Sequence, residues 1–196
     1  MVTIAGLGNP GKEYENSRHN IGWVVLSAIV TRYQLPSFTK SARYNGLLSE
    51  GVLHGAEVGV LFPTTYMNNS GIAVERYVLT HGALDSLVVV HDDIDIPFGE
   101  IRVSFDRGAG GNNGVSSIID AFHSKRFARI RVGIAKKNIF GTIKRPKGEA
   151  LSKFVLGTLT AHEQRHIEDL VDKVDHALEV FIKKGIMNAM QECNKE

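Results

Sequence analysis

Short clusters of polar residues stand at the ends of the strands and helices that this sequence predicts. They are Asn9, Arg18-His19-Asn20, Met67-Asn68-Asn69, His91-Asp92-Asp93, and a glycine-rich stretch, 108–114, that contains Asn112 and Asn113. A histidine near a carboxylate makes a general base, because the acid fixes the imidazole tautomer and stabilises the imidazolium. Asparagine amides both donate and accept hydrogen bonds, so several of them can hold a peptide or an ester without adding charge. These residue types together favour hydrolysis by an activated water.

Each cluster also has an ordinary structural interpretation. A histidine before a helix is more often a surface or capping residue, and Asn69 and Asn113 are suitable helix N-caps. The acidic run 92–95 could form a turn or a Mg²⁺ site. No cysteine or serine stands in a nucleophile motif, which argues against a covalent intermediate. The placement of all the clusters at segment ends nevertheless favours a shared site.

Two well-known motifs occur literally but lack the context that their chemistry needs. Residues 6–11, Gly-Leu-Gly-Asn-Pro-Gly, fit the dinucleotide-binding pattern, but Pro10 removes an N–H donor and no helical periodicity follows. Residues 162–166, His-Glu-Gln-Arg-His, fit a zinc-protease pattern, but no third ligand follows at a suitable spacing. Glu163 also forms a capping box with Thr160. We therefore predict a tight glycine turn in the first case and a surface pair of histidines in the second.

The charge of the chain is unevenly distributed. The 196 residues are 43% hydrophobic and 22% charged, which excludes wholesale disorder, and the single cysteine excludes an internal disulfide. The net charge of +2 conceals a basic segment, residues 99–150, with 11 basic and 4 acidic residues. This basic segment favours a polyanionic partner, with a solvated lysine-rich loop as the alternative. No signal peptide or membrane-spanning stretch is evident, so we expect a cytoplasmic protein with no membrane partner.

The elements that must position these residues alternate between strands and helices. Apolar or alternating runs predict strands at residues 2–7, 87–90, 100–105 and 128–135, and a hairpin over 43–62 with Gly51 and Gly55 near its turn. Helical periodicity predicts helices over 20–34, 69–81 and 113–123, and a long C-terminal helix from about residue 160. The pattern indicates an α/β fold, a single domain over residues 1–196 with a mixed, largely parallel sheet covered by helices on both faces. In such folds the functional loops follow the carboxyl ends of the strands.

Taken together, these motifs closely resemble those of the bacterial-type peptidyl-tRNA hydrolase family. The resembling residues occur in order within 6–11, 14–22, 63–71, 91–97, 110–114, 129–133 and 154–157, which span nearly the whole chain. The resemblance implies an enzyme that hydrolyses the ester bond between a peptide and the 3′-terminal ribose of tRNA. Such an enzyme recycles peptidyl-tRNA released from translation.

The resemblance also implies roles for individual residues. It assigns His19 as the general base that activates water and Asp92 as the carboxylate that orients it. The implied partner is peptidyl-tRNA, bound at its acceptor stem and 3′ end, and the implied enzyme is a monomer without a cofactor or metal. The substrate-binding residues that it implies are Asn9, Tyr14, Asn20, Met67, Asn68 and Asn113.

A tRNA substrate would explain the basic segment, because most contacts to tRNA are salt-dependent contacts to phosphate. The candidates are Arg102, Arg107, Lys125, Arg126, Arg129 and Arg131, followed by Lys136, Lys137, Lys144, Arg145 and Lys147. Arg129 and Arg131 alternate with apolar residues, which predicts that both point from one face of a strand. The chain departs from the family pattern at Asn112, where histidine is frequent, at Ser104, where many members have a basic residue, and at Ala135, where glycine is frequent.

Two other functions remain open at this stage. A non-catalytic RNA-binding module would share the fold and the basic segment, because a fold alone does not establish an activity. A dinucleotide-dependent oxidoreductase would depend on residues 6–11 alone. The first predicts tRNA binding without turnover, and the second predicts an absorbance change with a nicotinamide cofactor.

Overall fold

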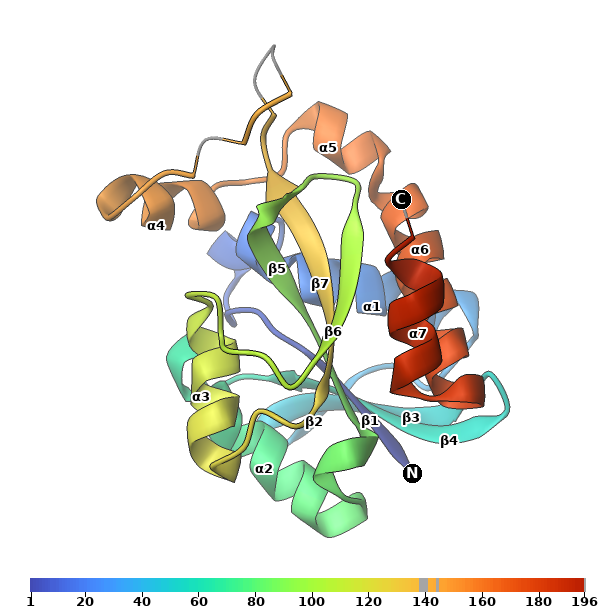
Figure 1. Ribbon diagram of the computed structural model, residues 1–196. Helices are drawn as coiled ribbons and strands as arrows, with labels where there is room; N and C mark the ends of the chain where they lie inside the picture. The colour runs from blue at the N-terminus through green and yellow to red at the C-terminus, as the bar shows by residue number, and fades with distance from the viewer. Residues whose placement is uncertain (138–140, 144, 196) are drawn as a thin grey trace.

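The computed structural model describes residues 1–137, 141–143 and 145–195 and contains one seven-stranded sheet (Figure 1). The strand order is β2-β3-β4-β1-β5-β7-β6. The central strands β4, β1, β5 and β7 are parallel, and antiparallel strands extend the sheet on both sides. The strands are β1 (Val2–Gly6), β2 (Thr39–Ser41), β3 (Gly46–Leu53), β4 (Ala56–Pro63), β5 (Leu87–Pro97), β6 (Ile101–Phe105) and β7 (Ala128–Ala135).

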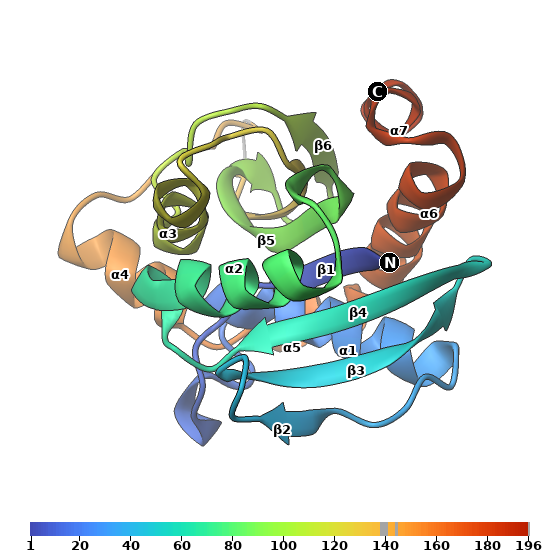
Figure 2. The same cartoon turned by 90° about the horizontal axis from the view of Figure 1, so that it is seen from below.

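Helices cover both faces of the sheet, as Figure 2 shows. The helices α1 (Ile21–Arg32) and α6 (Ile167–Lys184) pack on one face, and α2 (Ser70–His81) and α3 (Asn113–Phe122) pack on the other. Within β1, Ile4 belongs to the first core and Ala5 to the second, because successive side chains of a strand face opposite sides. The predicted α/β fold with a mixed, largely parallel sheet is therefore confirmed. In the described part of the chain, no helix is long and apolar enough to cross a membrane.

Most predicted elements are present within a few residues of their predicted bounds. The strand β7 covers the predicted residues 128–135, whereas β5 extends beyond the predicted 87–90 to Pro97. Gly55 lies in the turn between β3 and β4 with a φ of 85°, a conformation that glycine adopts without strain. No helix begins within residues 6–11, and a short 3₁₀ helix, Lys12–Tyr14, follows them. The absence of a helix there agrees with the rejection of a dinucleotide-binding loop, but residues 7–10 form no hydrogen-bonded turn, and the chain only bends at Gly11.

The single long C-terminal helix was a wrong prediction. The capping box of Thr160 and Glu163 is present, but the segment is divided into α5 (Ala161–Arg165), α6 and α7 (Ile186–Cys193). Gly185, with a φ of 81°, ends α6 and lets α7 fold back beside β6 (Figure 1). Asn194 then exchanges two hydrogen bonds of 2.8 Å with the backbone of Val103, which covers an exposed sheet edge. The sequence also did not predict β2 or the helix α4 (Glu149–Leu156).

Candidate active site

His19 and Asp92 come together at the carboxyl ends of the central strands. Asp92 lies on β5, just beyond its all-apolar run, and His19 lies in a 3₁₀ helix, Arg18–Asn20, directly before α1. His19 Nδ1 lies 2.9 Å from Asp92 Oδ1, and the two side chains are only 12% and 5% exposed. The two atoms are within ion-pair distance, but their arrangement falls short of a regular hydrogen bond. Catalytic hydrogen bonds often become aligned only in the complex with substrate.

A glycine at the start of α1 allows this approach. A Cβ atom on Gly22 would lie 2.5 Å from the carbonyl oxygen of Val90 and 3.1 Å from that of Leu7. Any side chain at this position would push the beginning of α1, and His19 with it, away from β5. Gly22 therefore permits the close helix–strand packing that brings His19 to Asp92.

Two histidines adjoin Asp92, and their pKa values are shifted in opposite directions. Burial is the largest influence on His19 and favours its neutral form, but the adjacent Asp92 carboxylate outweighs it and raises the pKa of His19. His91 is fully buried, and its Nδ1 donates to the Asp92 carbonyl oxygen at 2.8 Å. Burial lowers the pKa of His91 to about 4. His91 therefore stays neutral, and His19 is the histidine that can exchange a proton in the cavity.

The His19–Asp92 pair lines a cavity of about 120 Å³, which we call the catalytic cavity. The loop that leads into α3 and the first residue of this helix form one side, and one face of α4 forms the other. The sequence left α4 unassigned, although its apolar residues have helical spacing. The catalytic cavity is lined by His19, Asp92, Asp93, Ile94, residues 109–113, Arg145, Leu151, Ser152 and Val155.

Arg18 attaches the His19 loop to α4 and α5. Its Nε and Nη2 donate to the two carboxylate oxygens of Glu163 at 3.0 and 2.7 Å. Its Nη1 donates to the carbonyl oxygens of Phe154 and Gly157 at the end of α4. Burial by itself would raise the pKa of Glu163, but the hydrogen bonds from Arg18 and Thr160 hold it below its usual value. The capping box was the only sign of this pair in the sequence, and it did not reveal Arg18 as the partner.

Asn9 is held in place by two other residues that the resemblance selected. Its backbone N–H donates to Asn20 Oδ1 at 2.8 Å, and Asn20 Nδ2 donates to the Asn9 carbonyl oxygen at 2.9 Å. Asn9 Oδ1 accepts from the backbone N–H of Met67 at 2.9 Å. Among the described residues, Asn9 Nδ2 has no partner. The buried Asn20 and Met67 therefore hold Asn9 in place, and Asn9 itself lies outside the lining of the catalytic cavity.

Asn68 and Asn113 are exposed on adjoining helix ends. Asn68 lies in a 3₁₀ helix, Met67–Asn69, and Asn113 is the first residue of α3. These two elements pack closely because residue 114 is glycine: a Cβ there would lie 2.4 Å from Met67 Sδ. Asn113 lines the catalytic cavity, whereas Asn68 and the half-buried Tyr14 lie outside its lining.

Asn112 and Arg145 also belong to the site, although neither was predicted as a catalytic or substrate-binding residue. Asn112 Nδ2 donates to Asp92 Oδ1 at 2.8 Å. Arg145 connects β5 to the loop before α3, because it donates to the Asp95 carboxylate at 3.0 Å and to the Gly110 carbonyl oxygen at 3.1 Å. Both contacts join segments that are distant in sequence, so no local pattern could reveal them.

Comparison with known proteins agrees with this geometry. The family model for peptidyl-tRNA hydrolase matches residues 3–196. The chain belongs to the peptidyl-tRNA hydrolase family. Peptidyl-tRNA hydrolases from Syntrophotalea carbinolica and Bacillus subtilis are each 38% identical to it, over 99% of this chain and 97% and 98% of theirs. The crystal structure of the peptidyl-tRNA hydrolase from Acinetobacter baumannii matches with a TM-score of 0.86 and 28% identity, covering 99% of this chain and 94% of that one.

This member of the peptidyl-tRNA hydrolase family has a second cavity of about 280 Å³ beside the first, which we call the arginine pocket. Arg129 is only 2% exposed and donates from Nη1 to the Gly108 carbonyl oxygen at 2.9 Å. Its Nε and Nη2 have no partner within the described structure. Arg131 and Arg107 also line the pocket, so the prediction that Arg129 and Arg131 share a strand face is confirmed. Burial, together with the charges of Arg131 and Arg107, lowers the pKa of Arg129 to about 10.

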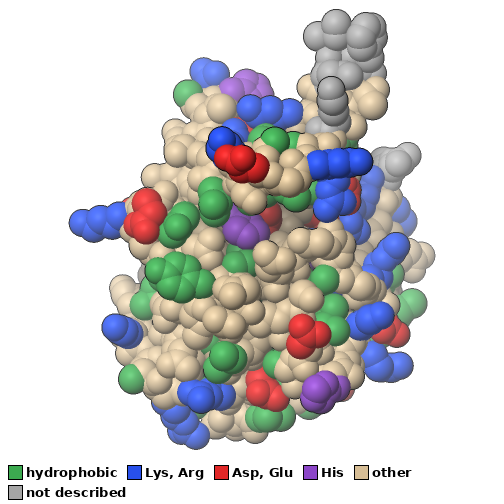
Figure 3. Space-filling model, turned by 90° about the vertical axis from the view of Figure 1, so that its left-hand side faces the viewer, with side chains coloured by type: hydrophobic (Ala, Val, Ile, Leu, Met, Phe, Trp, Pro, Cys, Tyr) green, Lys and Arg blue, Asp and Glu red, His purple; other side chains and the backbone are tan. Residues whose placement is uncertain are grey.

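The arginine pocket has the chemistry of an anion-binding site. Its one described carboxylate, Asp93, is already paired with Arg131 Nε at 2.7 Å. Buried donors without partners are rare in folded proteins, and guanidinium groups suit phosphate. Figure 3 shows the face that lies on the left in Figure 1. A histidine is visible there in a hollow, and Lys and Arg side chains gather along the right-hand side.

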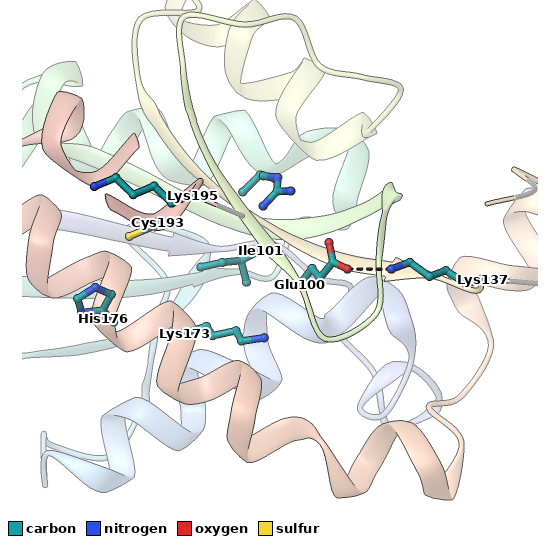
Figure 4. Close-up of a pocket in the computed structure, with 8 residues that line it drawn as sticks. Glu100, Ile101, Lys137, Lys173, His176, Cys193 and Lys195 are labelled. Atoms are coloured by element: carbon teal, nitrogen blue, oxygen red, sulfur yellow. Dashed lines mark hydrogen bonds and ion pairs between the residues drawn. The ribbon is translucent and has the colours of Figure 1, made fainter. Parts of the chain in front are cut away.

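Arg102, Lys125 and Arg126 lie outside the lining of the arginine pocket. Arg102 lines a larger cavity of about 560 Å³ between β6, α6 and α7, where Lys137 pairs with Glu100 at 3.0 Å (Figure 4). Among its described lining residues, this cavity has no histidine in contact with a carboxylate. Lys125 lines a shallow cavity beside α3, and the Arg126 guanidinium lies over the Phe105 ring. Lys144 lies outside the described residues.

The His-Glu-Gln-Arg-His motif is a pair of histidines on α5. The rings of His162 and His166 lie 4.5 Å apart, and His166 Nδ1 donates to the His162 carbonyl oxygen at 2.8 Å. Glu163 turns away from them toward Arg18. Over residues 1–137, 141–143 and 145–195, no group of three or more His, Cys, Asp or Glu side chains could hold a metal ion.

Proposed function

We propose that this protein hydrolyses the ester bond between a peptide and the 3′-terminal ribose of tRNA and so recycles peptidyl-tRNA released from translation. The observation that carries the proposal is the His19–Asp92 contact in the catalytic cavity of a chain that belongs to the peptidyl-tRNA hydrolase family. The neutral amides of Asn112 and Asn113 line the same cavity, and we assign no covalent nucleophile. A water molecule therefore attacks the ester carbonyl carbon.

In the proposed reaction His19 is the general base. Its Nδ1 faces Asp92, so Nε2 takes the proton from water as the new carbon–oxygen bond forms. Asp92 stabilises the resulting imidazolium, which then gives its proton to the ribose oxygen as the ester bond breaks. Amide hydrogens of Asn9, Asn68 and Asn113 hold the acyl group and its developing negative charge.

In the same proposal, the arginine pocket binds a phosphate of the tRNA backbone. The pocket shares Asp93, Ala109 and Gly110 with the catalytic cavity, so a phosphate bound there lies beside the reacting ester. Arg102, Lys125 and Arg126 lie farther along the surface and are proposed as outer contacts to the acceptor stem. We further propose that the enzyme acts as a cytoplasmic monomer without a cofactor or metal, and light scattering with and without tRNA tests its oligomeric state.

The test compares the wild type with His19→Ala on peptidyl-tRNA and on free aminoacyl-tRNA. We expect release of peptide by the wild type and a loss of about 10³-fold in kcat for His19→Ala, with tRNA affinity retained. Binding of tRNA without turnover by the wild type would contradict the proposal and support an RNA-binding module. An absorbance change with a nicotinamide cofactor would support the oxidoreductase instead.

A further inference from the structure

We propose that Asn112 is a positioning residue for the general base. Asn112 fixes the Asp92 carboxylate, and this carboxylate in turn orients His19. The inference rests on the proposed function and extends the pair to a chain of three side chains, His19, Asp92 and Asn112. All three line the catalytic cavity.

The amide of Asn112 has a fixed orientation. Asn112 is the N-cap of α3, and its Oδ1 accepts hydrogen bonds from the backbone N–H groups of Gly114 and Val115 at 3.0 and 3.1 Å. Since both of those groups are donors, the atom that faces them must be the amide oxygen. Nδ2 is therefore directed at Asp92, to whose Oδ1 it donates at 2.8 Å. A weaker contact of 3.4 Å joins the same nitrogen to the Asp92 carbonyl oxygen.

Asn112 and His19 contact the same oxygen atom. His19 Nδ1 lies 2.9 Å from Asp92 Oδ1, and Asn112 Nδ2 lies 2.8 Å from it. The Asp92 side chain is 5% exposed, so solvent contributes little to holding it. The hydrogen bond from Asn112 thus fixes the position of the carboxylate relative to the imidazole.

The same hydrogen bond has an electrostatic effect. A donor to an ionised carboxylate favours its charged form, and the positive end of the ten-residue helix α3 acts in the same direction. Because the amide is neutral, it stabilises the charge on Asp92 without adding a group that titrates. It also lessens the attraction of that carboxylate for the proton on His19. Loss of the donor should therefore raise the pKa of His19 further.

The other charged groups around His19 are already paired with residues other than Asn112. Arg18 is paired with Glu163 on α5, Asp93 on β5 with Arg131 on β7, and Arg145 with Asp95 on β5. His91 is buried and neutral. Substitution of Asn112 leaves all of these pairs in place, so a change in the titration of His19 reports on Asp92.

Two substitutions separate the cap from the contact with Asp92. Asn112→Ser keeps an N-capping oxygen but removes the amide Nδ2 donor, and Asn112→Asp keeps the cap but places a second carboxylate against Asp92. Asn112→Ala removes both functions. Ser116→Ala, at an exposed position in the first turn of α3, is the matched control and should leave the activity unchanged.

The experiment measures kcat and KM for peptidyl-tRNA hydrolysis against pH, and follows the His19 ring protons by NMR. For Asn112→Ser we expect a loss of about tenfold in kcat with KM unchanged within about twofold. For Asn112→Asp we expect a loss of about 100-fold near neutral pH, partly recovered at higher pH, because a second negative charge raises the pKa of the base. The pKa of His19 should increase in the order wild type, Asn112→Ser, Asn112→Asp.

The inference is overturned if Asn112→Ser retains the wild-type kcat and His19 titration. It is also overturned if KM rises while the titration is unchanged, because Asn112 would then bind substrate instead of positioning Asp92. Thermal unfolding of each variant checks the fold, and Asn112→Ser decides the question alone if Asn112→Asp does not fold. Failure of the proposed function can be told apart from failure of this inference. If the proposed function is wrong, the wild type does not hydrolyse peptidyl-tRNA, but the His19 titration still reports whether Asn112 controls Asp92.

Discussion

The catalytic cavity and the arginine pocket adjoin each other, but they differ in how many of their buried polar atoms have a partner. In the catalytic cavity, Asp92 Oδ1 is contacted from two sides, by His19 and Asn112. In the arginine pocket, Nε and Nη2 of Arg129 and the hydroxyl of Ser104 are buried without a partner among the described residues. The contrast fits the proposed roles, because groups that perform chemistry need fixed partners, whereas groups that bind an anion need donors that remain open.

The pocket also explains how a serine fits at position 104, where many family members have a basic residue. Arg107 and Arg131 already lower the pKa of the buried Arg129 by their charge, and burial lowers it more. A further cation there would increase this repulsion. Ser104 instead adds a hydroxyl donor to the lining without adding charge.

Of the two regions, the catalytic cavity should show the larger effect on activity when its charge is changed. Asp92→Asn removes the carboxylate that raises the pKa of His19, so we expect kcat to fall by about 10²-fold. The base must be neutral to accept a proton, and activity is therefore lost as the pH falls through its pKa. In Asp92→Asn this acidic limb should move to lower pH, while the affinity for tRNA stays unchanged. A pH–rate profile whose acidic limb does not move would show that Asp92 does not control His19.

A smaller effect, confined to binding, is expected from the arginine pocket. Arg131→Glu should raise KM by about tenfold and flatten the salt dependence of tRNA binding by about one unit of slope, with kcat nearly unchanged. Lys125→Glu makes the same charge change outside the pocket and serves as the comparison. Equal effects of the two substitutions would mean that overall charge, and not the pocket, attracts tRNA. If Arg131→Glu does not fold because its carboxylate lies beside Asp93, Arg131→Gln replaces it in the same measurement.

A third effect concerns stability and not activity, and comes from His91, which lines the arginine pocket and contacts the backbone of Asp92. Its pKa in the folded state is lowered to about 4, so below pH 6.5 the unfolded state binds a proton that the folded state does not. The free energy of unfolding should therefore fall by up to about 3 kcal/mol between pH 6.5 and pH 4 on account of His91. Urea unfolding of the wild type and His91→Asn at both pH values measures this difference.

His19 has the opposite linkage to pH. Its pKa is raised in the folded state, so its contribution to stability is present at low pH and is lost as the pH rises through the raised value. His19→Ala should therefore steepen the acid destabilisation that His91 causes. A His91→Asn variant with the same pH dependence as the wild type would contradict the assignment of a buried, neutral His91.

Local patterns in the sequence were enough to predict most of the elements. The strand β7 alternates basic and apolar residues, and its predicted bounds agree with the structure. The contact between His19 and Asp92 followed from the resemblance of their motifs, not from periodicity. The division of the C-terminal segment was not predictable, because it depends on the packing of α7 against the edge strand β6.

The contacts that hold the site together could not be predicted from the sequence, because they join residues that are far apart along the chain. Arg18 and Glu163 form a buried pair across 145 positions of the chain, and Asn112 reaches Asp92 across 20. The sequence by itself determined the strand and helix periods, the excess of positive charge and the residue types available for catalysis, because these properties are local. The tertiary structure alone decided which polar atoms share partners and which remain open. Partnership and burial are properties of the packed chain, and they shift the pKa of His19 upward and that of His91 downward, which is why we propose only His19 as the base.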